Sequence, residues 1–553
     1  MKLLLLVGIL MFHQPAITQN NSCKISFDAT VNLINGHTNA ATVKPGDTIC
    51  LTAGTRNFLL ISYIHGTREA PVTIINKGGQ VTILNSPNYA IKFDSCSHVR
   101  FTGSGDPLIP YGFKTVNAPG TGVSVDGMTT DIELDRLEVS YTAYAGIIAK
   151  TEPDCAFKST RDKFTLRNLS IHDCYVHHTG NEGFYIGSSK FKNGQTLTCN
   201  GYDTVVFPHL LKGVRIYSNL VEFSGWDGIQ VSSADSGCFI HDNTVLYDSE
   251  GEVLYQMSGI ILGGGTRAEC FNNTIRDGKG DGIDVVSQGI QKIYNNLICN
   301  PGRTYKPDQN VTPYLKHGIY LGPDYAAPAN TYLLLNNTIL SPKSYCVQFA
   351  DGQSTGNLIV NNILVNPGSY SMIGDIAYLH FTSSVDVTIT NNIKTLNIND
   401  LDFKDPAEGD FDLKKSSPAV NNGMVIDGFP VNFDLLNRPR PFAHLYDIGA
   451  FECQDSSLLA IEDRTLPGVI LKPVTPNPIR DYFILDYQLV KETTVEIALF
   501  DIRGLKLREI LHDKQRPGDY LLKVDCDSLQ PGCYLLYFKT GNSGLIEKII
   551  QTQ

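Results

Sequence analysis

The 553-residue sequence has little of what builds helical proteins, membrane spans or nucleic-acid-binding faces. Long apolar stretches with helical spacing are almost absent, so a mainly α-helical architecture is excluded. Acidic side chains outnumber basic ones and give a formal net charge of −11, which argues against a nucleic-acid partner because such proteins present a basic face. Beyond the N-terminus no segment is long and apolar enough to span a bilayer, so we expect no transmembrane segment.

The N-terminal apolar segment has the layout of an export signal. Lys2 precedes the apolar run 3–12, and small and polar residues follow as far as Gln19. The run is too short to cross a bilayer, so residues 1–19 are predicted to be a signal peptide and the mature chain to be secreted.

The thirteen cysteines match no zinc-binding spacing. In a secreted chain they permit disulfides. The predicted pairs are Cys155 with Cys199, which flank one repeat, and Cys526 with Cys533, which are close enough to staple a hairpin.

What the sequence does have is an asparagine that recurs inside short apolar runs. The intervals between successive members are 24, 30, 23, 41, 25 and 30 residues, and the members are Asn219, Asn243, Asn273, Asn296, Asn337, Asn362 and Asn392. Repeats of this size with one strand-like run each indicate a solenoid. Stacked amides can also satisfy one another in the interior. The predicted fold class is therefore all-β, a parallel β-helix solenoid.

A glycine in register with the asparagines supports the repeat. Gly228 follows Asn219 by nine residues, and Gly282 follows Asn273 by nine. A one-residue slip would turn every apolar side chain outward, so a register this constant is meaningful. Residues 20–452 are predicted to form the β-helix with a terminal cap over 409–452. Residues 453–470 read as a linker, and 471–553 as a small β-sandwich of alternating strands.

The C-terminal segment resembles a known family. The Pro476-Asn477-Pro478 turn, the FDIRG segment 500–504, Pro531-Gly532-Cys533-Tyr534 and the basic-apolar ending are similar to the C-terminal sorting domain of type IX secretion in Bacteroidota. The resemblance implies that the type IX machinery is a partner. It also implies that the mature chain is released or attached to the outer cell surface.

The rest of the mature chain resembles the right-handed parallel β-helix superfamily of pectate lyases, alginate lyases and polygalacturonases. The likeness lies in KPGDTICL (44–51), APVTI (70–74), GGQVTI (78–83) and DIGAFE (447–452). The resemblance implies an extracellular acidic or neutral polysaccharide as the substrate.

The glycine register defines two rows of residues that follow the solenoid axis. The pre-glycine row, one residue before each glycine, is Ala145, Glu182, Asp227, Ser258, Asp281, His317 and Tyr345. The post-glycine row, two residues after it, is Ile148, Tyr185, Gln230, Ile261, Asp284, Tyr320 and Gln348. Stacked carboxyl groups raise one another's pKa, which produces a general acid near neutral pH. The candidate catalytic residues are Glu182, Asp227, Asp281, Asp284 and His317. The alternative is that Asp-Gly merely marks a turn.

The candidate substrate-binding residues lie beside these carboxyl groups. An aromatic face next to polar groups is a common way to hold a sugar ring. The set comprises Tyr185, Trp226, Gln230, Lys316 and Tyr320. Two insertions, 190–210 and 300–316, are predicted to wall the two ends of a groove for several sugar units.

The sequence therefore favours an extracellular polysaccharide-degrading enzyme, either a hydrolase that uses paired carboxyl groups or a lyase. A lyase would use calcium held by carboxylates, with Lys316 as the base. Residues 280–284 are similar to the Asp-Gly-Ile-Asp part of the polygalacturonase motif, but that family's adjacent aspartates and Arg-x-Lys are missing. The alternative is a non-catalytic glycan-binding or adhesive surface protein. No residue is assigned to a metal, no other cofactor is expected, and we expect a monomer.

Overall fold

The computed structural model describes residues 22–84, 88–305, 315–323, 330–369, 377–426, 428–442, 445–455, 465–466, 468–501, 505–526, 529–541 and 543–552. The chain divides into two units, Met1–Gln454 and Asp455–Gln553. The predicted signal peptide lies outside the described residues, as does most of the predicted linker. Among the described residues the only helical element is a single 3₁₀ turn, η1 (Ile398–Leu401), so the all-β prediction is confirmed.

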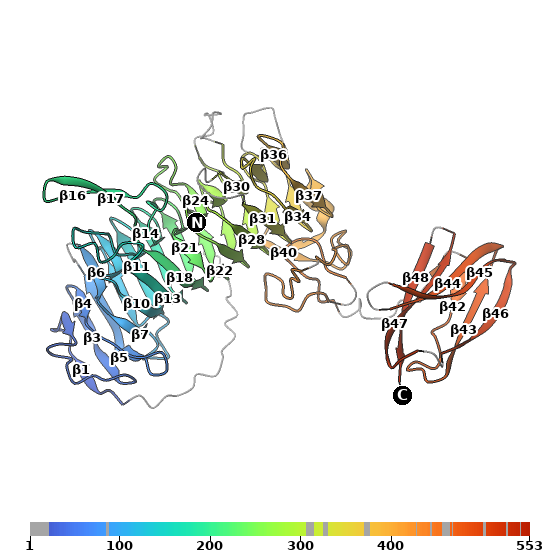
Figure 1. Cartoon of the computed structure of the whole chain (residues 1–553), viewed down its shortest axis with the longest axis horizontal. Helices are drawn as coiled ribbons and strands as arrows, with labels where there is room; N and C mark the ends of the chain where they lie inside the picture. The colour runs from blue at the N-terminus through green and yellow to red at the C-terminus, as the bar shows by residue number, and fades with distance from the viewer. Residues whose placement is uncertain are drawn as a thin grey trace. The chain divides into compact units, whose positions relative to one another are not determined.

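The first unit is a solenoid in which parallel strands stack rung upon rung into three faces (Figure 1). The first face consists of β1 (Ile25–Phe27), β3 (Thr48–Arg56), β5 (Val72–Leu84), β7 (Ser97–Thr102), β10 (Thr130–Asp135), β13 (Thr165–His172), β18 (Leu210–Tyr217), β21 (Ala234–Ser236), β22 (Cys238–His241), β25 (Ala268–Phe271), β28 (Ile290–Tyr294), β31 (Thr331–Leu335), β34 (Asn357–Val360) and β37 (Val387–Thr390).

The second face continues from the end of β5, which pairs with both β7 and β8. It consists of β8 (Phe113–Val116), β11 (Leu137–Thr142), β14 (Tyr175–Thr179), β19 (Leu220–Ser224), β23 (Thr244–Leu246), β26 (Thr274–Arg276), β29 (Leu297–Cys299), β32 (Thr338–Leu340), β35 (Ile363–Val365) and β38 (Ile393–Thr395).

The third face carries the two rows defined by the glycine register. Its strands are β2 (Leu33–Asn35), β4 (Leu59–Ser62), β6 (Tyr89–Asp94), β9 (Thr121–Asp126), β12 (Ile147–Ala149), β15 (Phe184–Ile186), β20 (Ile229–Val231), β24 (Ser258–Leu262), β27 (Asp281–Val285), β30 (Ile319–Leu321), β33 (Val347–Phe349) and β36 (Leu379–Phe381). Ile229, Ile260, Ile283 and Ile319 pair in turn and are fully buried. Because strand side chains alternate between faces, this buried stack fixes which residues point outward.

The recurring asparagines form the predicted interior ladder. Each side-chain amide donates to the next asparagine, so that Nδ2 of Asn273 lies 3.0 Å from Oδ1 of Asn296, and Nδ2 of Asn296 lies 3.0 Å from Oδ1 of Asn337. Each amide also donates to a backbone carbonyl, which for Asn296 is that of Cys270 at 2.9 Å. The ladder gives hydrogen-bond partners to polar groups that would otherwise be buried without them. It therefore holds the corner between the first and second faces in register.

A second asparagine column lies on the outside of the same corner. Its members precede ladder residues in the sequence and adopt φ between +52° and +58°; they are Asn272, Asn295, Asn336, Asn361 and Asn391. Asparagine tolerates this left-handed conformation better than most residues do. Their amides donate to Asn437 Oδ1 and to the carbonyl groups of Phe433, Asp447, Met424 and Asn422.

The described part of the segment predicted as a terminal cap therefore runs back along the outside of the rungs, and we call residues 422–426, 428–442 and 445–453 the strap. It follows the hairpin of β39 (Phe403–Asp405) and β40 (Asp410–Leu413). A fully buried ion pair between Arg440 Nε and Glu452 Oε2, 3.0 Å apart, ties the strap together internally.

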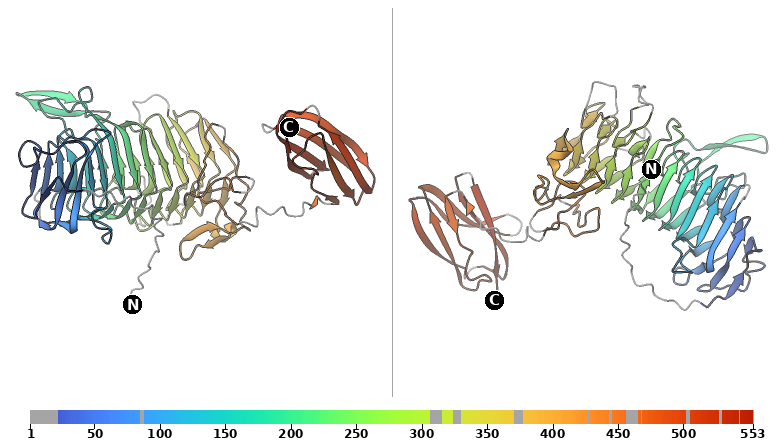
Figure 2. Two further views of the ribbon diagram at one scale, coloured as in Figure 1. Left: turned by 90° about the horizontal axis from the view of Figure 1, so that it is seen from below. Right: turned by 180° about the vertical axis from the view of Figure 1, so that it is seen from behind.

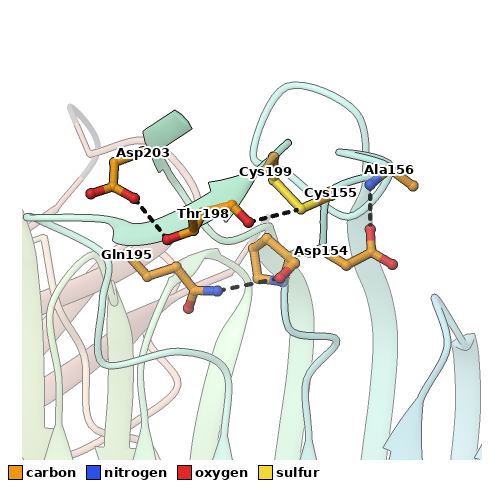
Figure 3. Close-up of a disulfide and its surroundings, with 8 residues drawn as sticks. Asp154, Cys155, Ala156, Gln195, Thr198, Cys199 and Asp203 are labelled. Atoms are coloured by element: carbon orange, nitrogen blue, oxygen red, sulfur yellow. Dashed lines mark hydrogen bonds between the residues drawn. A yellow bond between two sulfur atoms is a disulfide. The ribbon is translucent and has the colours of Figure 1, made fainter. Parts of the chain in front are cut away.

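One hairpin projects from the solenoid between β15 and β18 (Figures 1 and 2). It is formed by β16 (Gln195–Cys199) and β17 (Tyr202–Val206). The disulfide between Cys155 and Cys199 ties it down as predicted, and Cys155 Sγ also lies 3.7 Å from the Thr198 carbonyl oxygen (Figure 3).

The other cysteine predictions had mixed outcomes. A second disulfide joins Cys23 to Cys50 and was not predicted. Cys533 is a free thiol, so the predicted staple to Cys526 was wrong. Both residues belong to the second unit, whose strands are held together by the packing of two sheets against each other.

That second unit is a β-sandwich of two antiparallel sheets. One sheet contains β41 (Thr465–Leu466), β42 (Val469–Leu471), β43 (Tyr482–Leu489) and β46 (Gly518–Asp525), and the other contains β45 (Lys506–Gln515), β44 (Thr493–Asp501), β47 (Gly532–Thr540) and β48 (Ser543–Gln551). Phe483, Leu485, Ile497 and Phe538 lie in one shared core. The packing of the sheets replaces the staple predicted from the cysteines.

Candidate active site

The two rows lie in register on the third face. Asp284 pairs with Ile261 on one side and Tyr320 on the other, and Gln230 pairs with Tyr185. The structure therefore brings together residues from five successive rungs, 182–320. Most of them are more buried than a groove lining would be, because Glu182, Asp227 and Asp281 are all at most 5% exposed.

Asp281 is held by a buried cation. Lys316 Nζ lies 2.9 Å from Asp281 Oδ2, and the backbone N–H of His317 donates to Asp281 Oδ1 at 2.5 Å. Burial opposes the charge on Lys316, but the carboxylates of Asp281 and Asp284 outweigh it and raise the lysine pKa above its usual value. Lys316 is therefore a charged partner of Asp281 and not a free base.

Asp227 and Glu182 are buried acids. Burial raises the pKa of Asp227 to about 8, and the nearby carboxyl groups of Glu182 and Asp248 add to the shift. Ser258 Oγ donates to Asp227 Oδ1 at 2.7 Å, while the other oxygen, Oδ2, has no partner among the described residues. Burial likewise raises the pKa of Glu182 to about 7. The sequence predicted such shifts from stacked charge, but the larger cause is removal from water.

Asp284 is the acid in this group that solvent reaches. It is partly exposed and lies on β27, three residues after Asp281. Burial of its inner side, followed by the neighbouring charge of Asp281, raises its pKa well above the usual value. Its Oδ1 is buried without a hydrogen bond within the described part of the chain. A carboxyl group with a raised pKa beside a fixed ion pair is an arrangement suited to a general acid.

His317 is a neutral ring in this environment. Burial lowers its pKa to about 4. The backbone N–H of Tyr345 donates to His317 Nδ1 at 3.3 Å, which leaves the ring proton on Nε2. The ring stacks on Tyr345, with centroids 5.2 Å apart. His317 can thus donate a hydrogen bond but does not carry a charge near neutral pH.

The predicted substrate-binding residues differ in how far solvent reaches them. Tyr185 and Gln230 are buried, whereas Trp226 and Tyr320 are partly exposed. Lys316 is buried against Asp281. Trp226 and Tyr320 are therefore the members of the set that a ligand could reach from solvent, and the binding roles of all five stay predictions.

Two residues that the sequence analysis missed contribute charge to the site. Asp248 is buried, accepts from Ser249 Oγ at 2.7 Å, and has a pKa raised by burial to about 6. Lys150 Nζ lies 4.1 Å from the ring centre of Tyr185, and its charge partly offsets the rise in the pKa of Glu182. Both lie in corner segments outside the glycine register, so spacing gave no signal for either.

The two insertions predicted to wall a groove lie only partly within the described residues. The first, 190–210, contains the β16–β17 hairpin, whose Tyr202 is 78% exposed. Most of the second, 306–314, lies outside the described residues. The groove they were predicted to form stays a prediction.

The described residues contain one group with the geometry of a metal site, and it lies elsewhere. Ligand atoms of Glu133, Asp135 and His172 all lie within 4.8 Å of one another on the first face. Arg100 already contacts both carboxylates, with Nε 3.0 Å from Glu133 Oε1. A cation there would have to displace the guanidinium group. The calcium predicted for a lyase stays a prediction.

Two family models match the chain, one in each unit. A model of the right-handed β-helix region matches residues 209–393, and a model of the secretion system C-terminal sorting domain matches residues 473–552. This chain is a type IX-secreted parallel β-helix protein. The β-helix protein is directed to the cell surface or the extracellular space, with the secretion machinery as a partner, as predicted. No helix of the described residues is long and apolar enough to cross a membrane.

Solved structures with a similar fold share little sequence with this β-helix protein. A lacto-N-biosidase from Eubacterium ramulus is 14% identical, with 64% of this chain and 63% of that chain covered and a TM-score of 0.38. An alginate lyase from a Paenibacillus species is 15% identical, with coverage of 66% and 99% and a TM-score of 0.35. The pectate lyase Pel9A is 14% identical, with coverage of 78% and 97% and a TM-score of 0.36. Among curated proteins none matches the sequence.

Proposed function

We propose that this protein is an extracellular carbohydrate-active enzyme that hydrolyses a glycan on the third face. The observation that carries the proposal is the pairing on β27 of Asp284, a partly exposed acid with a raised pKa, with Asp281, a carboxylate held by Lys316. Glycoside hydrolysis uses two carboxyl groups, one as the acid and one as the base.

Asp284 would donate its proton to the glycosidic oxygen as the bond to the anomeric carbon breaks. A water would add to that carbon and lose a proton to the Asp281 carboxylate. Lys316 and the His317 backbone N–H would hold Asp281 in position through hydrogen bonds. Tyr320, adjacent to Asp284 in the post-glycine row, supplies an aromatic surface for the sugar.

The state of Lys316 favours hydrolysis over elimination. A lyase needs a base to take the proton beside the uronate carboxyl group, and Lys316 was the best candidate for that role. Its pKa is raised by two aspartates, and its Nζ is committed to Asp281. A lysine that keeps its proton this firmly is a poor base.

The test is a polysaccharide panel incubated with the mature chain, in calcium and in chelator, with assays for new reducing ends and for ultraviolet absorbance. Asp284→Asn and Asp281→Asn should each lower reducing-end release by about 100-fold or more. The matched control is Asp235→Asn, which removes a partly exposed aspartate of β21 on the first face and should leave release unchanged.

Release that rises together with absorbance would replace the hydrolase with a lyase. Release that survives both substitutions would remove this aspartate pair from the reaction. If no glycan in the panel is cleaved but some are bound, the protein is a binding or adhesive surface instead.

A further inference from the structure

Four stacked rings stand at the corner between the second and third faces. Tyr141, His178, Phe223 and Tyr247 occupy equivalent positions on successive rungs. Ring centroids lie 4.8 Å apart for Tyr141 and His178, and 4.9 Å apart for each of the next two pairs. We call these four residues the corner ladder.

The backbone of the corner ladder is unusual for aromatic residues. All four adopt φ of +53° or +54°. On neighbouring rungs the same left-handed position holds small polar residues, namely Asn117, Asp277, Asn300, Ser341 and Asn366. Bulky side chains disfavour this conformation, and such outliers concentrate at functional sites.

Burial does not account for the choice of aromatic residues. Tyr141 is 52% exposed, Phe223 37% and Tyr247 39%. A fold that needed only a tolerated corner residue would use asparagine, as three other rungs do. Exposed rings held in a disfavoured conformation point to a surface that contacts something in solution.

One end of the corner ladder presents an open ring face. Tyr141 stacks on His178 on one side, while the preceding rung offers only Asn117, which is exposed. The Tyr141 hydroxyl makes no hydrogen bond to any described residue. A shallow depression of about 530 Å³ lies here, lined among others by Asn117, Pro119, Tyr141, Thr142 and Thr179. Its lining contains no Asp, Glu, Lys or Arg.

We propose that this depression binds a pyranose ring of an uncharged glycan, stacked on the open face of Tyr141. An aromatic face with amide and hydroxyl groups at its edge matches the apolar face and hydroxyl rim of a sugar. A lining without Asp, Glu, Lys or Arg disfavours a uronate, a nucleotide or a phospholipid headgroup. The inference goes beyond the proposed function, since a four-residue step of chain separates His178 from Glu182 and no catalytic residue takes part.

The test is calorimetric titration of the full mature chain carrying Asp284→Asn, which keeps the glycans intact. The probes are the hexasaccharides of cellulose, xylan and mannan, with hexagalacturonate as the charged comparison. At least one neutral probe should bind, and Tyr141→Asn should weaken that binding about tenfold. The variant places at position 141 an asparagine, the residue found at the equivalent positions 117, 300 and 366. It should therefore fold, which circular dichroism would check.

Phe223→Asn is the matched control, because both ring faces of Phe223 are covered and its loss leaves the open face of Tyr141 in place. It should weaken binding less than threefold. The proposal is overturned if no neutral hexasaccharide binds, if Tyr141→Asn binds as tightly as its parent, or if hexagalacturonate is preferred. Glycan cleavage by the Asp284→Asn chain would instead contradict the proposed function and leave this inference standing.

Discussion

Asp227→Asn should remove part of the pH dependence of the stability of the β-helix. Asp227 is fully buried, and burial raises its pKa to about 8, whereas a carboxyl group in an unfolded chain titrates near pH ~3.9. The folded state therefore binds this proton more tightly. The resulting stability is fully present below about pH 4 and is lost as the pH rises through about 8.

The size of the effect follows from the shift. A difference of roughly four pKa units at ~1.4 kcal/mol each gives roughly 6 kcal/mol as an upper value. Asparagine carries no charge at any pH, and its Oδ1 can still accept from Ser258. The variant should match the wild type below about pH 4, diverge from it progressively as the pH rises, and exceed its free energy of unfolding by several kcal/mol near pH 8.5.

Urea unfolding of the mature chain at a series of pH values measures this, with the sandwich and solenoid transitions separated. Glu133→Gln is the control of opposite sign. A hydrogen bond from His172 lowers the pKa of Glu133, so its contribution is present above the unfolded pKa and is lost as the pH falls. Glu133→Gln should therefore destabilise the protein near neutral pH. Parallel pH profiles for the wild type and Asp227→Asn would refute the assignment of Asp227 as a buried, protonated acid.

Two further predictions concern the scaffold. Asn296→Ala leaves the Cys270 carbonyl and the Asn273 backbone N–H without partners in the core, so urea unfolding should show a loss of roughly 3–5 kcal/mol, against about 1 kcal/mol for the partly exposed Asn392→Ala. Equal losses would mean that burial of the ladder bonds adds nothing to their contribution. Cys155→Ser should speed limited proteolysis within 195–206 while leaving the unfolding of the solenoid unchanged, and an unchanged cleavage rate would show that the disulfide does not hold the hairpin.

The fold was predictable because one residue type serves the same purpose on every rung. An interior amide must meet another amide above and below it, so the spacing of residues such as Asn273 and Asn296 records the rung length directly. The glycine register worked for the same reason. Its spacing alone places Asp281 opposite Ser258 and Asp284 opposite Ile261, which is the pairing that β24 and β27 adopt.

The site was less predictable because its charges depend on corners and burial, which have no period. Asp248 comes from the corner after β23, and nothing in the spacing links it to Asp227. The substrate contact predicted for Lys316 stays a prediction, and nothing in the spacing indicated that its Nζ would donate to Asp281. The residues of the second asparagine column can be seen in the sequence as the first members of Asn-Asn pairs. The strap partners of Asn336 and Asn361, however, lie more than 60 residues away in the sequence.

The strap also governs how a mechanical load reaches the solenoid. Its last residues are anchored well inside the stack, where the Gly449 N–H donates to the Asn361 carbonyl and the Ala450 N–H to Thr338 Oγ1. A pull applied beyond Cys453 therefore enters through rungs that have neighbours on both sides, and not through β38 at the open end. Several outer asparagines share the tension side by side. Under such a load the exposed final rung is spared from being the first to unfold.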